Sequence, residues 1–148
     1  MAVNPNVEGR VYPTTKPYVV SRAKIAEFAA AVGARDAAHT DVVVARARGY
    51  ADAIAPPTFA VIVAQQGWAG VMADEEVGID YSRLVHGAEE VVHYRPLVAG
   101  DEVTAHTRIE RASNIGDNSM ITLVTELKVG TEAVTRTMSV IVIRGSEA

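Results

Sequence analysis

The residues best suited to chemistry gather in a polar loop between two apolar stretches. Asp36, His39 and Asp41 lie in this loop, in the segment GARDAAHTD that begins at Gly33. A histidine exchanges a proton near neutral pH, and a carboxylate close to it can serve as the second acid or base. The loop is therefore the first place to look for chemistry, with His39 and Asp36 as candidate residues.

The same residues also have structural interpretations. An Asp after Gly-x-x commonly bonds its own backbone, so Asp36 is equally suited to a turn or a helix cap. His39 could be a loop histidine that caps a helix, and Asp41 stands where an N-cap is expected. The residue types alone leave the roles of Asp36 and His39 open.

Composition and charge limit the classes of partner and the kinds of site that this chain can be expected to have. The formal net charge of the 148 residues is −4, and nucleic acid is not expected because phosphate binding needs a basic face. The absence of cysteine removes thiolate nucleophiles and fits a reducing cytoplasm. His93 and His106 have no partner at ligand spacing, so no metal site is expected. The longest apolar run is too short to span a bilayer, and we expect a cytoplasmic protein without a membrane span.

Small helices are predicted on both sides of the loop. Ser21 is a suitable N-cap, and apolar residues within 25–32 recur at helical spacing until Gly33, where a left-handed C-cap would end the helix. A second, short helix is predicted from Thr40 or Asp41 through Arg48. These two helices must hold the polar loop in place.

The longest apolar run follows Pro56 and Pro57. The segment FAVIVAQQGWAGVMA (59–73) is apolar nearly all round, which is typical of a helix wrapped by protein. At 1.5 Å per residue this helix would be about 24 Å long. We expect it to form the centre of the fold.

The second half of the chain predicts antiparallel strands. Residues 102–111 alternate between apolar and polar, residues 121–129 alternate again, and a third strand is expected over 133–143. A further strand is predicted over 89–96, with a short edge strand at 18–20. The order of elements indicates one α+β domain over residues 1–148, with the sheet rolled around the central helix. A sheet this curved has an open side, and a dimer would cover it.

Four segments together resemble the MaoC-like, hot-dog-fold dehydratase family. They are GARDAAHTD (33–41), GYADAIAPPTF (49–59), LVHG (84–87) and YRPLVAGDEV (94–103). The likeness covers nearly the whole chain and is greatest to the N-terminal MaoC-type, or FAS-like, dehydratase branch, which includes the A and C subunits of the mycobacterial (3R)-hydroxyacyl-ACP dehydratase. The resemblance implies a hot-dog fold and reversible loss of water at the 2,3-bond of an acyl thioester, with no cofactor.

Two departures from the family pattern bear on the candidate site. The family loop has Gly-Asp followed by His, and placing Gly33 on that glycine puts His39 on the histidine but Ala34 on the aspartate. Asp36 lies two residues later. The family's His-Gly pair before the central helix, whose Gly amide binds the thioester oxygen, corresponds to Pro56-Pro57. Because proline has no N–H, the amide of Thr58 or Phe59 would have to replace that donor.

The resemblance thus implies a dehydratase subunit that shapes the acyl pocket for an ACP- or CoA-bound substrate beside a catalytic MaoC-type partner. The substrate-binding residues implied are Pro57, Thr58, Phe59, His86 and Gly87, although His86-Gly87 would equally suit a strand-start turn. One alternative is a self-sufficient homodimeric (R)-specific enoyl-thioester hydratase that uses His39 and Asp36. Another is a non-enzymatic acyl-binding protein. A thioesterase is disfavoured because the central segment 58–73 has no carboxylate.

Overall fold

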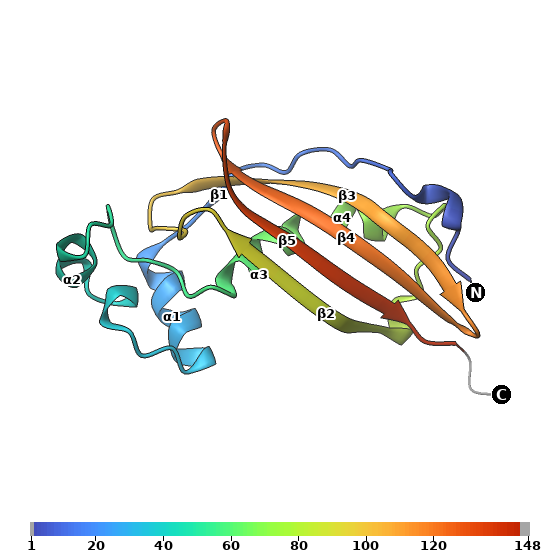
Figure 1. Cartoon of the computed structure of the whole chain (residues 1–148), viewed down its shortest axis with the longest axis horizontal. Coiled ribbons are helices and arrows are strands. Elements are labelled where there is room, and N and C mark those ends of the chain that lie inside the picture. Colours follow the sequence, from blue (N-terminus) through green and yellow to red (C-terminus); the bar gives the residue numbers. More distant parts are fainter. Residues whose placement is uncertain (1, 146–148) are drawn as a thin grey trace.

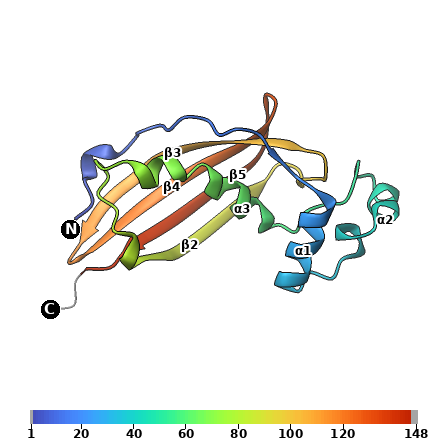
Figure 2. The same cartoon turned by 180° about the vertical axis from the view of Figure 1, so that it is seen from behind.

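A curved antiparallel sheet with a helix along one face dominates the computed structural model, which describes residues 2–145 (Figures 1 and 2). The strand order is β1-β3-β4-β5-β2, and every neighbouring pair is antiparallel. The strands are β1 (Tyr18–Val19), β2 (Leu84–His93), β3 (Glu102–Ile115), β4 (Asn118–Val129) and β5 (Glu132–Ile143). The predicted α+β architecture, a sheet rolled around a central helix, is confirmed.

The alternation predicted for the long strands is confirmed. In β3, the side chains of Val103, Ala105, Thr107 and Ile109 are all buried against the helix side of the sheet. The side chains between them are more exposed. Tight turns at Gly116 and Gly130, both with positive φ, join β3 to β4 and β4 to β5. The buried face of these strands forms the sheet side of the hydrophobic core.

The strand predicted over residues 89–96 is real, but its bounds were wrong. β2 begins five residues earlier, because Leu84 pairs with Ile143 at the end of β5, and it stops at His93. The pairing slips by one residue between His86 and Ala88, so Gly87 is a β-bulge. A Cβ at Gly87 would come within 3.3 Å of the Val140 carbonyl oxygen, and this close approach explains why glycine suits the position.

The central helix departs from the prediction in two ways. It is divided into α3 (Phe59–Gln66) and α4 (Ala69–Ala73), because the chain turns more tightly at Gly67 and Trp68. Gly67 lies directly on β3, where a Cβ would overlap the Thr107 hydroxyl. The helix is also not wrapped all round, because the sheet covers only one side of it. The exposed residues on its open side are Gln65, Gln66, Ala69, Gly70 and Ala73.

The small helices form as predicted. Ser21 caps α1 (Arg22–Val32) by accepting a hydrogen bond from the Lys24 amide, and Gly33 ends this helix in the left-handed conformation. Asp41 caps α2 (Val42–Ala47) through the amides of Val43 and Val44. A short 3₁₀ turn, η2 (Ala37–His39), joins the two helices and carries the polar loop. Two further 3₁₀ turns, η1 (Pro5–Val7) and η3 (Tyr81–Arg83), were not predicted.

The N-terminal arm covers one edge of the sheet. Beyond the short β1, amides of the arm donate to β3 carbonyls: Gly9 to Ile109 at 2.8 Å, and Tyr12 to Thr107 at 3.0 Å. The arm thereby occupies the edge that β1 leaves open. At the other edge of the described sheet, β2 pairs only with β5. The backbone groups on the outer side of β2 are therefore open to another strand.

Candidate functional site

The polar loop lies at the end of the sheet where the central helix begins. In Figures 1 and 2, α1, η2 and α2 form a small lobe beside the start of α3. The segment from Ala53 to Pro57 connects this lobe to the helix. Its backbone is fixed by hydrogen bonds from the Ile54 amide to the Ala38 carbonyl at 3.0 Å and from the Ala55 amide to the Leu97 carbonyl at 2.8 Å.

His39 has the proton arrangement that a general base requires. The side chain is buried, with 7% of its surface exposed, and its Nδ1 lies 2.7 Å from the Ile54 carbonyl oxygen. Because a carbonyl oxygen can only accept, Nδ1 carries a proton and donates it. In the neutral ring Nε2 then has a free lone pair, and it makes no hydrogen bond to any residue between 2 and 145. His39 is therefore held in the tautomer that can accept a proton.

Asp36 is occupied elsewhere. Its Oδ1 accepts hydrogen bonds from the Ala38 amide at 2.9 Å and from Arg48 Nη1 at 2.6 Å. The amide bond, followed by the Arg48 guanidinium, holds the pKa of Asp36 below its ordinary value. The His39 amide donates to the Asp36 backbone carbonyl at 3.1 Å, but within residues 2–145 no hydrogen bond joins the Asp36 carboxyl group to the His39 ring. The interpretation of Asp36 as a cap is confirmed, and its lowered pKa makes it a weak base.

The start of α3 leaves the backbone amide of an exposed residue, Thr58, without a partner among residues 2–145. The Phe59 amide donates to the Pro56 carbonyl at 3.0 Å, whereas the Thr58 amide has no acceptor among residues 2–145. Pro57 and Thr58 are exposed. The Phe59 side chain is fully buried, and its ring packs edge-on against Phe28 and Tyr18. Of the two predicted donors, only the Thr58 amide is free, and Phe59 belongs to the core.

His93 also contacts this segment, a contact that the sequence did not suggest. Its Nε2 lies 2.8 Å from the Pro57 carbonyl oxygen, and its Nδ1 lies 3.0 Å from Thr135 Oγ1. The two residues that meet, Pro57 and His93, are 36 positions apart. Two histidines thus bind carbonyls of the same short segment, His39 at Ile54 and His93 at Pro57.

His86 and Gly87 are not part of this arrangement. The bulge at Gly87 turns both His86 and Glu89 toward the helix side of the sheet, and His86 Nε2 lies 2.7 Å from Glu89 Oε2. The His86 ring is 5.8 Å from the ring of Trp68, which follows the far end of α3. The structure therefore places this pair beside the second half of the central helix, away from His39.

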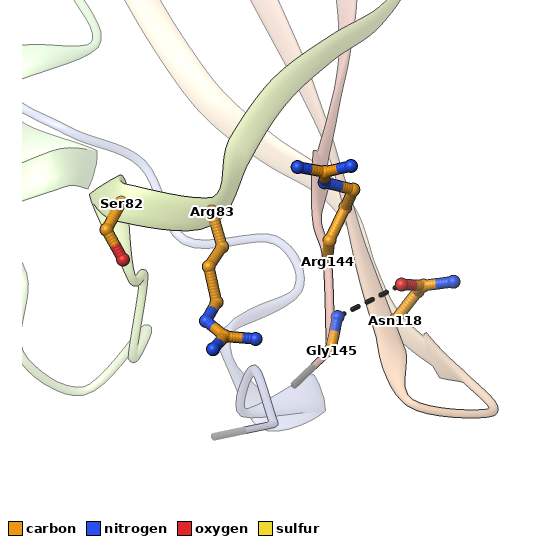
Figure 3. Close-up of a pocket in the computed structure, with 5 residues that line it drawn as sticks. All are labelled: Ser82, Arg83, Asn118, Arg144 and Gly145. Atoms are coloured by element: carbon orange, nitrogen blue, oxygen red, sulfur yellow. Dashed lines mark hydrogen bonds between the residues drawn. The ribbon is translucent and has the colours of Figure 1, made fainter. Parts of the chain in front are cut away.

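One cavity of the structure is remote from the polar loop. It has a volume of about 540 Å³ and lies where β2 begins and β5 ends, between Ser82, Arg83, Asn118, Arg144 and Gly145. Figure 3 shows that the guanidinium groups of Arg83 and Arg144 point in different directions. Two arginines that do not converge on one point do not form an anion site. Among residues 2–145, no cluster of potential metal ligands and no helix able to cross a membrane is found.

Comparison with known proteins identifies the family of this chain and the solved structures that share its fold. A model of the family described as "FAS1-like, dehydratase domain region" matches residues 6–137. A UPF0336 protein of Clavibacter michiganensis subsp. michiganensis is 43% identical over 149 residues, covering 100% of both chains. The HadBC (3R-hydroxyacyl-ACP dehydratase) complex of Mycobacterium tuberculosis contains a similar chain, with a TM-score of 0.81 and 22% identity over 92% of this chain and 96% of that one. A MaoC-like dehydratase gives a TM-score of 0.82 at 24% identity, over 95% of this chain and 43% of the other.

The curved sheet around a central helix is the hot-dog fold that the two solved structures share. Within that class, the chain belongs to the family of FAS1-like dehydratase domains. The predicted resemblance to MaoC-like hot-dog dehydratases is confirmed.

Proposed function

We propose that this chain is a subunit of a (3R)-hydroxyacyl-thioester dehydratase, and that it shapes the acyl pocket beside a catalytic MaoC-type partner. The observation that carries the proposal is the position of Asp36. Ala34 occupies the place of the family's catalytic aspartate, and Asp36 caps η2 and pairs with Arg48. Within residues 2–145, His39 keeps a free Nε2, and no carboxyl group bonds to its ring. The missing acid or base would come from a partner.

The surface of the fold supports association with a second hot-dog chain. The open side of the central helix carries small and uncharged residues, including Ala69 and Ala73, that a neighbouring chain would cover. The outer side of β2 is unpaired, and two of its exposed side chains are valines, Val85 and Val92. The HadBC relative is itself a complex. An unpaired strand of ten residues is the kind of edge that pairs with another chain.

In this proposal the Thr58 amide donates to the carbonyl oxygen of the acyl thioester. Elimination of water from a 3-hydroxyacyl thioester begins by removal of the C2 proton, which places negative charge on that oxygen. A backbone N–H at the start of α3 stabilises the charge, and the positive end of the helix dipole adds to the effect. The 3-hydroxyl then leaves with a proton from an acid.

A second candidate is a self-sufficient homodimeric (R)-specific enoyl-thioester hydratase. The tautomer of His39 favours it, because a free Nε2 on a buried histidine is suited to accept a proton. In such an enzyme His39 would work with Asp36, and the ion pair between Asp36 and Arg48 would have to open.

Hydration of crotonyl-CoA, measured by loss of its ultraviolet absorbance, separates the two functions. The chain is purified alone and also together with a MaoC-type protein whose loop has the intact Gly-Asp…His pattern. We expect turnover only in the mixture. Robust turnover by the chain alone, lost in His39→Ala and retained in a His106→Ala control, would establish the self-sufficient enzyme instead. Absence of turnover from every combination would reject both.

A further inference from the structure

His93 stands between the sheet and the entrance to the central helix. It is the last residue of β2 and pairs with Thr135 of β5, whose side chain is fully buried. The side chain of His93 therefore points toward the helix, where it reaches the Pro57 carbonyl. The backbone on its C-terminal side is also fixed, because the Tyr94 amide donates to the Val134 carbonyl at 2.9 Å.

The hydrogen bonds of His93 determine where its protons lie. Nε2 faces the Pro57 carbonyl oxygen at 2.8 Å, and this oxygen can only accept, so Nε2 donates. In the neutral ring Nδ1 then accepts a hydrogen bond from the Thr135 hydroxyl, 3.0 Å away. Both ring nitrogens are used. Unlike His39, His93 has no free lone pair with which to take a proton from substrate.

The two prolines explain why this contact matters. Pro56 and Pro57 have no N–H, so this part of the segment can be held only through carbonyl groups or side-chain packing. The Pro56 carbonyl accepts from the Phe59 amide, which closes a tight turn. The Pro57 carbonyl is bound by His93. Among the described residues, His93 makes the one hydrogen bond to the exposed Pro57–Thr58 peptide.

The planarity of the peptide bond connects His93 to the Thr58 amide. The Pro57–Thr58 peptide is trans, so its C=O and N–H point in opposite directions. When His93 holds the carbonyl oxygen, the N–H is directed to the opposite side, away from β2. Rotation of this peptide plane would turn the Thr58 N–H away from that direction.

We propose that His93 is a positioning residue, which aims the Thr58 amide at the thioester carbonyl by holding the Pro57 carbonyl. The proposal rests on the proposed function, because it takes an acyl thioester as the ligand of this site. It assigns His93 no proton transfer. The Thr135 hydroxyl supports the same arrangement by fixing the His93 ring from the opposite nitrogen.

Three variants separate this role from simple packing. His93→Phe keeps a flat ring but removes the donor to the Pro57 carbonyl. His93→Gln restores an N–H donor at nearly the position of Nε2. Thr135→Val leaves His93 in place and removes the hydroxyl that fixes its ring. His106→Phe is the matched control, because both ring nitrogens of His106 are also hydrogen-bonded, to the hydroxyls of Thr14 and Thr104, but on the outer face of β3.

The measurement is the ¹H–¹⁵N resonance of the Thr58 amide in the full-length chain, alone and in the complex, during titration with crotonyl-CoA. In the wild type we expect the amide proton to move downfield on saturation, as a donor to the thioester oxygen does. In His93→Phe the shift should be lost and the affinity should fall roughly three- to tenfold, the loss of one net hydrogen bond. Thr135→Val should have a smaller effect, and His93→Gln should recover the shift.

A Thr58 resonance that does not respond in the wild type, or a chain that does not bind crotonyl-CoA, would overturn the proposal. It would also fail if His93→Phe responded like the wild type, or if His93→Gln were as impaired as His93→Phe. If a variant fails to fold, Thr135→Val with its smaller perturbation decides the question. Turnover by the complex is measured separately, so an active complex without a Thr58 response would reject the roles of His93 and the Thr58 amide and leave the assignment as a dehydratase subunit standing.

Discussion

At the scale of single residues, the candidate site differs from a catalytic pair in the environment of one carboxyl group. Asp36 and His39 are three positions apart in a 3₁₀ turn, yet they bind different groups. The cap and Arg48 stabilise the ionised form of Asp36, which lowers its affinity for a proton. The His39 ring, in contrast, donates from Nδ1 to the Ile54 carbonyl, and its Nε2 is left free to accept a proton. The geometry assigns a structural role to the aspartate and a reactive tautomer to the histidine.

Asp36→Asn tests this assignment, because asparagine caps a turn about as well as aspartate but has no charge. In the mixture of the two chains, turnover should stay within roughly twofold of the wild type, because the exposed Asp36–Arg48 pair lies outside the reaction. A fall of several orders of magnitude without unfolding would instead support the self-sufficient hydratase.

The same variant has a predictable pH dependence. Since the pKa of Asp36 is lower in the folded chain, its charge stabilises the fold above the ordinary pKa of 3.8, and this contribution is lost as pH falls through the lowered value. The melting temperature of Asp36→Asn should therefore lie below that of the wild type at neutral pH and approach it in strong acid.

At the scale of elements, the strands and helix ends were predictable because their determinants are local. The alternation of Val103, Ala105 and Thr107 sets one face of β3, and Ser21 and Gly33 supply the two caps of α1. What could not be predicted depends on contacts between distant residues. The break at Gly67 follows from the proximity of Thr107, and the contact between His93 and Pro57 joins two elements with no sequence motif between them. The ion pair of Asp36 with Arg48 is likewise a property of the folded loop.

Gly67→Ala tests the cause of the break in the central helix. Alanine favours a helix over glycine by about 1 kcal/mol, so the local effect is stabilising. Here its Cβ would overlap the Thr107 hydroxyl, and Thr107 is buried and hydrogen-bonded to Thr125 at 3.0 Å. We expect a net loss of about 1–3 kcal/mol in the free energy of unfolding, measured by urea denaturation.

The double variant Gly67→Ala/Thr107→Ala provides the control. Removing the hydroxyl relieves the overlap, so the two substitutions together should destabilise the fold less than the sum of the single effects. Strict additivity, or a stabilising Gly67→Ala, would show that the tight turn at Gly67 and Trp68 has another origin.

At the scale of the whole molecule, the two edges of the sheet differ in whether another segment covers them. The N-terminal arm lies along the β1 and β3 edge, and Arg10 fixes it further by bonding Asp74 Oδ2 at 2.6 Å, just after α4. Within residues 2–145, β2 has no such cover, and the strand contains no proline. The bulge at Gly87 is its only irregularity in register. One protected edge and one open edge favour association through β2 into a closed pair rather than growth in both directions.

Lysines on β2 test this association directly. Val85 and Val92 lie on the outer face of the strand, 40% and 41% exposed, and Val85→Lys/Val92→Lys places two positive charges along the open edge. Because charged edge strands resist pairing, we expect the dissociation constant of the complex to rise roughly tenfold or more. The monomer's melting temperature should change little, since both side chains lie on the solvent face of the sheet and outside the core. Val11→Lys, at an even more exposed valine of the arm on the covered edge, is the matched control and should leave association unchanged. Analytical ultracentrifugation measures the dissociation constant for the double-lysine variant and for the Val11→Lys control. A double-lysine chain that associates like the wild type would show that the partner covers the open side of the helix without pairing with β2.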